Sequence, residues 1–428
     1  MLDIQFIREN TEKVKKGVVA KRLDSKIVTE VLGVDEKRRG LIKEIEKLRA
    51  ERNEISSSEH EVNSRGKEIK EKLKRLEPEL KELESKYNEL LYKIPNVFSD
   101  DTPVGEDESE NKVIRSWGKP KKFDFEPKDH VEIGRDIGII DTETAAKVSG
   151  ARFNYLKGAA VLLQNALHQF AISVLTDEKV LKEIAEKVHK GYSAKPFVPV
   201  IPPLMVKGEV MKKMARYNPV EERYYLDKDD LMLVGSAEHS LGPIYMDSTL
   251  TEKDLPLRYF AFTPAFRREA GSYGKDTRGI LRQHQFDKIE MESFSVPEDG
   301  LAEQDFFVGV QEYLMQQLEI PYQVVAICTG DMGTPDFRQI DIDSWMPGQD
   351  KYRETHTSDY MTDYQSRRLN FKVSIKGKNE FVHMNDATAF AMGRTIIAIL
   401  ENYQQKDGSV EIPKVLQKYM GKEKIVKP

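Results

Sequence analysis

The sequence predicts a mixed helix-and-strand protein in which a long helical hairpin precedes the globular part. Apolar residues repeat at helical spacing through about residues 35–93, whereas residues 113–428 mix strand-like and helix-like runs. With 428 residues, the chain is too long for one ordinary hydrophobic core. We therefore predict an N-terminal domain of residues 1–112 and a main domain of residues 113–428.

The predicted hairpin consists of two apolar stripes separated by a polar turn. The first stripe comprises Leu41, Ile45, Leu48 and Ile55. The second alternates steps of four and three residues, through Ile69, Leu73, Leu76, Leu80, Leu83, Tyr87 and Leu90. This is the seam pattern of a coiled coil, and helices of roughly 25 residues would project roughly 35–40 Å. The polar stretch SSSEHEVNSRG places the turn at Asn63 to Gly66, and Pro78 should kink or loosen the second helix.

On its pattern alone, this arm is more typical of a dimerisation or scaffolding coiled coil than of an RNA binder, because its acidic and basic side chains nearly balance. The arm ends at Ile94-Pro95-Asn96, and an acidic linker follows, SDDTPVGEDESEN. The linker is too polar to form a core of its own.

Composition narrows the class of protein further. The net charge of −5 argues against a general nucleic-acid coat protein. The single cysteine, Cys328, excludes an internal disulfide and a cysteine-built zinc site, and we expect it to be a buried thiol. No apolar run approaches the ~20 residues of a membrane span, and the start MLDIQFIREN lacks the order of a secretory signal. We expect a cytoplasmic protein without a membrane partner.

The most informative segment is residues 259–296, predicted as two strands joined by a loop rich in Gly, Arg and Lys. The strands are predicted at Tyr259 to Arg267 and at Phe286 to Val296, so that Arg267 and Glu269 share one face. If the second strand starts early, the residues sharing a face with them are Arg282, His284, Phe286, Lys288 and Glu290. Arginines bind phosphates, an aromatic ring stacks on a purine and a carboxylate accepts from its amine, so the group suits a nucleoside triphosphate.

Together these residues resemble a known family. The stretch TPAFRREAGSYGKDTRGILRQHQFDKIEM resembles motif 2 of the class II aminoacyl-tRNA synthetases, in the form found in seryl-tRNA synthetases. AMGRTIIAILENYQ looks like motif 3, GSAEHS like the serine-binding segment, and WMPGQDKYRE like the stretch before a metal-binding glutamate. CTGDMG and the N-terminal LDIQFIREN also look like this family. The resemblance covers essentially the whole chain and implies an α+β fold, an antiparallel sheet flanked by helices. The absence of Walker-type and Gly-x-Gly-x-x-Gly motifs agrees with it.

The resemblance implies an ATP- and Mg²⁺-dependent ligase that activates serine as an adenylate and transfers it to tRNA(Ser). Arg267 would hold the α-phosphate, Glu269 the adenine amine, and Phe286 the ring. Arg282 and Arg394 would bind the outer phosphates, and Arg394 would also cover the adenine. Glu354 and Thr357 would hold the magnesium ion. Arg267, Glu269 and Arg394 are the implied catalytic residues, and no zinc is expected.

The implied serine pocket is small and polar. Glu238 and Glu290 would neutralise the ammonium group, Ser236 would orient the substrate, and Thr388 would bond its hydroxyl. Ser236 and Glu238 lie two apart in the strand-like run LMLVGSAEHS, so we expect them to face the same way. Thr388 has an alternative role as a helix N-cap, since a helix is predicted directly after it.

Several positions depart from the family pattern. Ser236 replaces a threonine, the segment Glu354-Thr355-His356-Thr357 replaces a more serine-rich one, and Asp386 stands where asparagine is expected. The dimer-forming motif 1 maps onto Phe197, Val200 and Pro203, with Pro196 in place of its glycine. Residues 175–190 look like an extra piece of helix. His284 and His356 are expected to be structural.

The resemblance also implies partners. In this family the arm holds the long variable arm of tRNA(Ser), and the enzyme is a homodimer; whether tRNA(Sec) is also charged stays open. A ligase that delivers an amino acid to a carrier protein is one alternative, but such proteins would be expected to lack the arm. A non-catalytic paralogue is another, disfavoured because Arg267, Glu269 and Arg394 are all present.

Overall fold

The computed structural model describes residues 1–55, 62–270 and 278–427, and divides into two compact units. The first unit is Met1–Val97 and the second is Phe98–Pro428. This division lies N-terminal to the boundary near residue 112 that composition suggested, because the acidic linker belongs to the second unit.

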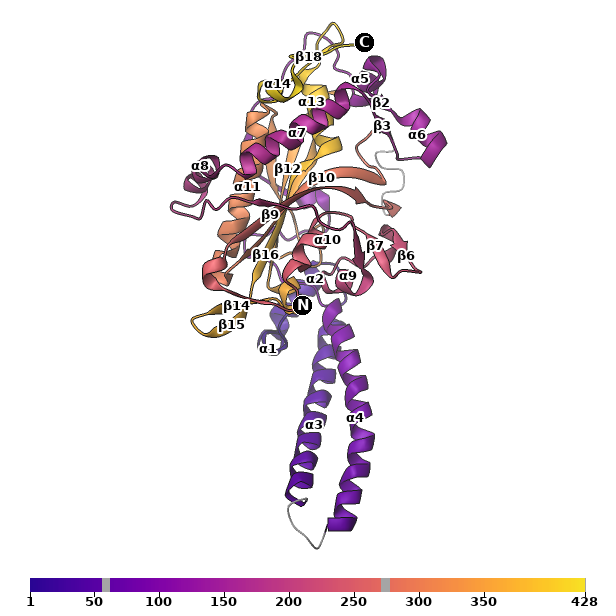
Figure 1. The fold of residues 1–428 in the computed structure, drawn as a ribbon, viewed down its shortest axis with the longest axis vertical. Coiled ribbons are helices and arrows are strands. Elements are labelled where there is room, and N and C mark those ends of the chain that lie inside the picture. The colour runs from indigo at the N-terminus through magenta and orange to yellow at the C-terminus, as the bar shows by residue number, and fades with distance from the viewer. Residues whose placement is uncertain (56–61, 271–277, 428) are drawn as a thin grey trace. The chain divides into compact units, whose positions relative to one another are not determined.

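The first unit is helical. Its helices are α1 (Ile4–Glu9), α2 (Thr11–Ala20), α3 (Lys26–Ile55) and α4 (Val62–Lys93). Helices α3 and α4 run antiparallel, since ion pairs join Arg49 to Glu77 and, further along α3, Glu51 to Arg65. Figure 1 shows this pair as the long hairpin. At 30 and 32 residues, the helices span about 45 Å each, and α3 begins before the predicted arm.

The seam of the hairpin is the predicted one. Its buried core is Leu41, Ile45, Leu48, Ile69, Leu73 and Leu76, with Ile55, Leu80 and Leu83 packed against it. Helix α4 continues through Pro78. The prediction of a turn at Asn63 to Gly66 was wrong, because α4 already begins at Val62. The rest of the polar stretch that we assigned to the turn, residues 56–61, lies outside the described residues.

The base of the hairpin is held by a buried carboxylate. Asp35 of α3 accepts from Arg8 Nε of α1 at 2.9 Å and from Arg39 Nε at 3.0 Å. Asp3 caps α1 by accepting from the backbone N–H groups of Gln5 and Phe6. The first residues are therefore tied to the arm by charge-assisted hydrogen bonds rather than by apolar packing alone.

The second unit is built on an eight-stranded sheet in the order β1-β11-β12-β13-β16-β10-β9-β4. Its strands are β1 (Lys112–Trp117), β4 (Val198–Pro199), β9 (Leu257–Phe266), β10 (Gln285–Ser295), β11 (Tyr322–Ala326), β12 (Arg338–Met346), β13 (Lys351–Thr362) and β16 (His383–Ala391). Every pairing in it is antiparallel except that of β4 with β9. The predicted α+β class with an antiparallel sheet is confirmed.

Helices cover the sheet, and short strands extend its loops. The helices are α5 (His130–Ile137), α6 (Thr142–Ser149), α7 (Ala159–Leu175), α8 (Glu178–Val188), α9 (Gly208–Lys213), α10 (Glu238–Leu241), α11 (Gly300–Gln317), α12 (Tyr364–Leu369), α13 (Met392–Tyr403) and α14 (Lys414–Met420). The short strands are β2 (Ile140–Asp141), β3 (Tyr155–Leu156), β5 (Met205–Lys207), β6 (Tyr225–Leu226), β7 (Leu231–Leu233), β8 (Thr249–Thr251), β14 (Lys372–Ile375), β15 (Lys378–Phe381), β17 (Val410–Glu411) and β18 (Lys424–Ile425).

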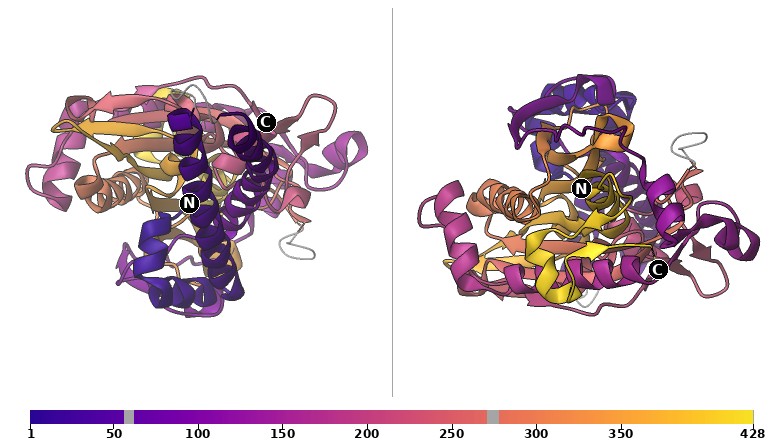
Figure 2. Two further views of the ribbon diagram at one scale, coloured as in Figure 1. Left: turned by 90° about the horizontal axis from the view of Figure 1, so that it is seen from below. Right: turned by 90° about the horizontal axis from the view of Figure 1, so that it is seen from above.

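The segment that looked like extra helix is α8, which packs against α11 (Figure 2). Gly309 of α11 allows this approach, because a Cβ there would lie 2.8 Å from a methyl group of Val188. Among the described residues, no single helix is long and apolar enough to cross a bilayer. Only α7 and α8 taken together reach that length and composition, and they are bent by 71° at their junction.

The acidic linker is ordered against the loop after β11. Asn111 accepts from the backbone N–H of Cys328 at 2.9 Å and donates to Asp331 at 2.8 Å. Ser99 and Thr102 are buried and hydrogen-bonded to each other. Cys328 is fully buried, as predicted. A segment too polar to form a core thus packs by hydrogen bonds onto one that already exists.

Candidate active site

In the middle of β10 and β16, one face of the central sheet carries apolar side chains and the other carries polar and charged ones. On β10, Ile289 and Met291 enter the core beneath α7, α11 and α13, whereas Glu290 and Glu292 alternate with them. Successive side chains of a strand point to opposite faces, so these carboxylates lie on the face away from that core. The predicted alternation along this strand is confirmed.

The next strand, β16, follows the same alternation. Ala387 and Ala389 belong to the core, and the buried residues Asp386 and Thr388 alternate with them. In the strand register, Thr388 pairs with Glu290. Since α13 begins only at Met392, Thr388 lies within a strand and the N-cap alternative was wrong. The register instead places its hydroxyl-bearing side chain beside a predicted serine-binding carboxylate.

The arginine-rich corner lies where β9 ends. Arg267 follows the last strand residue, Phe266, so Arg267 and Glu269 do not share a strand face as predicted; Glu269 has a left-handed φ of 53°. The residues nevertheless converge, because the turn brings Glu269 Oε2 to 3.4 Å from Arg282 Nη1. The guanidinium of Arg267 lies 5.4 Å from the centre of the Phe286 ring, and its Nε donates to the Gly235 carbonyl at 3.0 Å.

A β-bulge aligns the two predicted metal ligands. Glu354 and Thr357 lie three apart on β13, a spacing that would put them on opposite faces of a regular strand. Between β12 and β13 the register shifts, so that Thr357 pairs with Asp341 and Glu354 pairs with Asp343. The extra residue in β13 restores one shared face for both side chains. The side-chain oxygen atoms of Glu354 and Thr357 thus lie on one surface, together with those of Asp341 and Asp343.

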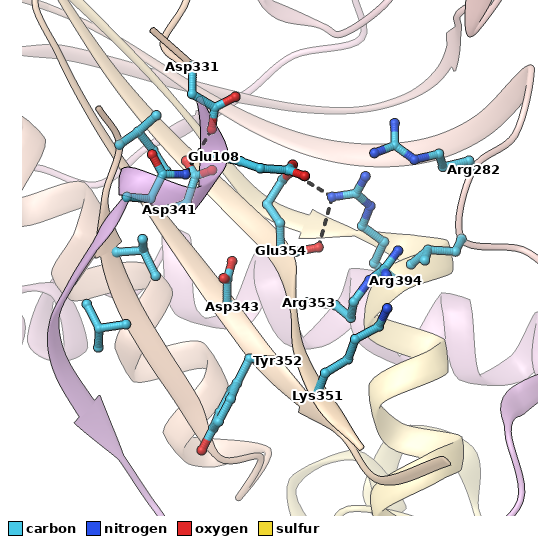
Figure 3. Close-up of a pocket in the computed structure, with 15 residues that line it drawn as sticks. Glu108, Arg282, Asp331, Asp341, Asp343, Lys351, Tyr352, Arg353, Glu354 and Arg394 are labelled. Atoms are coloured by element: carbon cyan, nitrogen blue, oxygen red, sulfur yellow. Dashed lines mark hydrogen bonds and ion pairs between the residues drawn. The ribbon is translucent and has the colours of Figure 1, made fainter. Parts of the chain in front are cut away.

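Arg394 meets this surface from α13. Its Nη1 donates to the Glu354 carbonyl at 2.8 Å and lies 2.7 Å from Glu354 Oε1. Figure 3 shows these two contacts, with Asp341 and Asp343 on the neighbouring strand. Burial, with the nearby Glu354 charge, raises the pKa of Asp343 to about 6. The surface therefore holds an excess of carboxylates that a divalent cation could offset.

The predicted serine-binding residues also converge, although not along a strand. Strand β7 ends at Leu233, Ser236 lies in a bend, and Glu238 begins α10, so the strand prediction for LMLVGSAEHS was wrong at these two residues. Both side chains are still buried. Lys288 joins them to β10, because its ammonium donates to Ser236 Oγ at 3.3 Å and contacts the Glu290 carboxylate.

A cavity of about 540 Å³ connects these groups. It is lined by one predicted serine-binding residue, Glu238, and by the predicted nucleotide-binding residues Arg267, Glu269, Arg282, Glu354, Thr357 and Arg394. A smaller cavity, lined in part by the same arginines, adds Phe286 and Thr388. Nucleotide-binding candidates therefore line the same space as Glu238 and Thr388, as a reaction between two bound substrates requires.

Comparison with known proteins agrees with this arrangement. Residues 1–98 match the family model described as seryl-tRNA synthetase N-terminal domain, and residues 221–403 match the tRNA synthetase class II core domain (G, H, P, S and T). Over 437 residues the chain is 44% identical to a serine–tRNA ligase from Fusobacterium nucleatum, with 100% of each chain covered. The chain belongs to the seryl-tRNA synthetase family.

Two solved structures of the family extend the likeness to three dimensions. The structure of seryl-tRNA synthetase from Pyrococcus horikoshii complexed with ATP is 39% identical, with a TM-score of 0.90 and complete coverage of both chains. The cytoplasmic serine–tRNA ligase from Naegleria fowleri in complex with AMP is 31% identical, with a TM-score of 0.88, and covers 100% of this chain and 99% of its own.

Arg216 is one of several charged residues of this site that sequence reasoning missed, together with Asp341 and Asp343. It follows α9, and its Nε lies 2.7 Å from Glu238 Oε1. Burial opposes its charge, but Glu238, Asp336 and Asp386 together raise the pKa of Arg216 above its usual range. No local signal marks it, because it lies in a loop far in sequence from these carboxylates. The part of motif 2 from residues 271–277 lies outside the described residues.

The two candidate structural histidines are tied to the backbone or to the core. His284 Nδ1 lies 3.1 Å from the Arg267 carbonyl. His356 is buried, and its burial lowers its pKa to about 3, so its ring is neutral. Thr355 Oγ1 lies 2.8 Å from its Nδ1. Both rings have positioning contacts that do not require a proton to be transferred.

Proposed function

We propose that this chain is a serine–tRNA ligase, which activates serine with ATP and transfers it to tRNA(Ser), releasing AMP and pyrophosphate. One observation carries the proposal. Arginines suited to a triphosphate and a carboxylate-lined pocket suited to an amino acid open onto the same cavity, on the polar face of an antiparallel sheet. The full-length similarity to serine–tRNA ligases supports serine as the amino acid.

The nucleotide would lie between Arg267, Phe286 and Arg394. Phe286 offers a ring for the adenine, and Glu269 a carboxylate for its amine, while Arg282 and Arg394 would bind the outer phosphates. Arg267 is placed to hold the α-phosphate and to stabilise the negative charge that grows there as the serine carboxylate attacks and pyrophosphate leaves. The similar structure that is complexed with ATP supports ATP as the nucleotide.

The residues present fit a magnesium ion. Glu354 and Thr357 offer oxygen atoms on one face, which is the donor chemistry that Mg²⁺ prefers beside phosphates. When bound, the ion would neutralise phosphate charge during the displacement. Thr357 Oγ1 also lies 3.4 Å from Asp359 Oδ1, so its hydroxyl orientation is already constrained.

Serine would enter the pocket formed by Ser236, Glu238, Glu290 and Thr388. The two glutamates would take its ammonium group, Ser236 would orient it and Thr388 would bond its hydroxyl. A buried polar group left unpaired costs about 1–3 kcal/mol, which disfavours alanine and glycine in this pocket.

The proposed function also includes a role for the helical hairpin and the formation of a homodimer. The hairpin would bind the long variable arm of tRNA(Ser), consistent with the match of residues 1–98 to the family's N-terminal domain. The predicted motif 1 region includes an edge strand, β4, and exposes Val198 and, at 99%, Ile201. An exposed apolar edge of this kind supports a homodimer. We also propose that the enzyme works in the cytoplasm.

Pyrophosphate exchange tests the proposal directly. ATP–pyrophosphate exchange should depend on serine and on magnesium, and it should survive zinc chelation because the chain has one cysteine. The assay should compare serine with threonine, alanine and glycine at equal concentrations. Faster exchange with one of those three, or loss of exchange on zinc removal, would count against the assignment.

A further inference from the structure

Three buried carboxylates from three separate elements meet in the serine pocket. Glu238 begins α10, Glu290 lies on β10 and Asp386 lies on β16. One oxygen atom of each lies within 4.8 Å of the others. The first two are the predicted ammonium partners, whereas Asp386 stands where the family pattern leads us to expect asparagine.

The strand register holds Asp386 in this position. It lies two residues before Thr388 on β16 and pairs with Glu292 of β10, while Thr388 pairs with Glu290. Asp386 and Thr388 therefore share the polar face of the sheet. Pairing of β16 with β10 on one side and with β13 on the other fixes the backbone of Asp386.

The cluster holds more negative than positive charge. Its cations are Arg216, whose Nη2 lies 3.7 Å from Asp386 Oδ2, and Lys288, which contacts Glu290. Around Asp386 are the further acidic groups Glu238, Glu292 and Asp359, and Asp336 also faces Arg216. Burial raises the pKa of Asp386 well above its usual range, Glu238 and Asp359 add to the effect, and Arg216 opposes it.

The oxygen atoms of Asp386 also lack donors. Within the part of the chain that the structure describes, neither Asp386 Oδ1 nor Oδ2 accepts a hydrogen bond. Glu290, in contrast, is already in contact with the Lys288 ammonium. Buried carboxylates without donors are costly, and such groups are normally satisfied by a partner. We therefore expect the carboxyl oxygens of Asp386 to bind a cation that carries several N–H or O–H donors.

We propose that Asp386 is a third acceptor for the ammonium group of the amino-acid substrate, beside Glu238 and Glu290. This inference rests on the proposed function. An ammonium group has three donors, and three carboxylates converge here from three directions. A divalent cation would have to compete with Arg216 and Lys288, which already contact the same carboxylates, so an ammonium group fits the charge balance better.

Arg216 acts here as a positioning residue. Its guanidinium bridges Glu238 and Asp386 from outside the cluster, at 2.7 Å and 3.7 Å. Its positive charge offsets the repulsion between these two carboxylates and so stabilises their close approach.

The variant Asp386→Asn tests the proposal, because it keeps the shape of the side chain and one acceptor oxygen but removes the charge. Loss of the negative charge from one acceptor of the ammonium group should raise the KM for serine about 10-fold or more. The KM for ATP should stay unchanged, and kcat should stay within about 3-fold, since the ammonium group is bound in both ground and transition states. An unchanged KM for ATP also verifies that the variant is folded.

A pair of inhibitors isolates the ammonium group. Serinamide retains this group, whereas 3-hydroxypropanamide keeps the hydroxyl and amide but lacks it. Serinamide should inhibit Asp386→Asn more weakly by the same factor as the rise in serine KM, and 3-hydroxypropanamide should inhibit both enzymes equally. Equal weakening of both inhibitors would overturn the proposal, because Asp386 would then act on another part of the substrate.

Glu292→Gln is the matched control. Glu292 is a buried carboxyl group on the same face, opposite Asp386, but outside the group of three. Burial and the charges of Glu238 and Glu290 raise its pKa well above its usual range, as burial does for Asp386, so the two variants change carboxyl groups in similar surroundings. The KM for serine should stay within about 3-fold in this variant. A rise equal to that of Asp386→Asn would show a general effect of the buried charges and would contradict the proposal.

The remaining outcomes separate this inference from the proposed function. If wild-type enzyme exchanges with serine and Asp386→Asn has an unchanged KM, only the role of Asp386 is wrong. If wild type exchanges with another amino acid, the same comparison applies to that amino acid, since all carry the ammonium group. If it exchanges with none, both proposals fail. Binding of Mn²⁺ that serine displaces and Asp386→Asn abolishes would make the cluster a metal site instead.

Discussion

Arg267→Ala is expected to slow adenylate formation about 10²–10³-fold, the effect of removing one transition-state donor. The guanidinium of Arg267 faces the shared cavity beside Phe286 and is anchored by the Gly235 carbonyl at 3.0 Å. Negative charge grows on the α-phosphate during attack, so most of the loss should appear in kcat. Pyrophosphate exchange at saturating serine and ATP measures it.

The neighbouring arginine supplies the control for this experiment. Arg268 is exposed, and its Nε donates to the Arg223 carbonyl at 2.8 Å rather than facing the cavity. Arg268→Ala should keep exchange within about 3-fold of wild type. Both variants should unfold at nearly the wild-type temperature. A folded Arg267→Ala enzyme with near wild-type exchange would refute the role of Arg267.

Replacing residues 37–92 with a short flexible linker is expected to separate the two half-reactions. Every residue proposed for the ATP and serine sites lies in the second unit, Phe98–Pro428, so serine-dependent exchange should stay within a few-fold of wild type. Charging of tRNA(Ser) should fall by about 10²-fold, chiefly through a higher KM for the RNA, because the arm would contact phosphates.

This second experiment needs two control measurements. Light scattering must find the same oligomer before and after trimming, since loss of a dimer would mimic loss of the arm. Binding of tRNA(Ser) by the intact enzyme should weaken as salt rises, and the trimmed protein should show a smaller dependence. If charging persists without the arm, the hairpin is a scaffold, as its balanced charge first suggested.

The spacing of apolar residues in the sequence was sufficient to predict features that repeat along a single helix pair or a single strand. The seam of the hairpin was predictable residue by residue, from Leu41 to Leu83, because helix packing repeats with the sequence. The alternation of Ile289, Glu290 and Met291 likewise follows from the geometry of a single strand. Family motifs added the candidate residues of the active site, most of which line two cavities that have several of these residues in common.

Tertiary structure decided how those residues meet. The bulge that brings Glu354 and Thr357 onto one face depends on the pairing of β13 with β12, which neither strand encodes alone. The turn into α10, rather than a strand, directs Ser236 and Glu238 inward, and the register of β16 makes Thr388 a strand residue instead of a helix cap. These errors share one cause, since local preferences yield to pairing with distant segments.

The sequence by itself determined that this protein carries a coiled-coil arm, an antiparallel catalytic core and the side chains of a seryl-tRNA synthetase. From the sequence, Asp386 could be identified only as a negative charge at a position where the family pattern has asparagine. Only the tertiary structure brought Arg216 within 2.7 Å of Glu238 and placed Asp386 beside Glu238 and Glu290, the two carboxylates predicted to bind serine. The physical reason is that charge balance in a buried pocket depends on distances between elements remote in the chain, and these distances exist only once the sheet and its loops have folded.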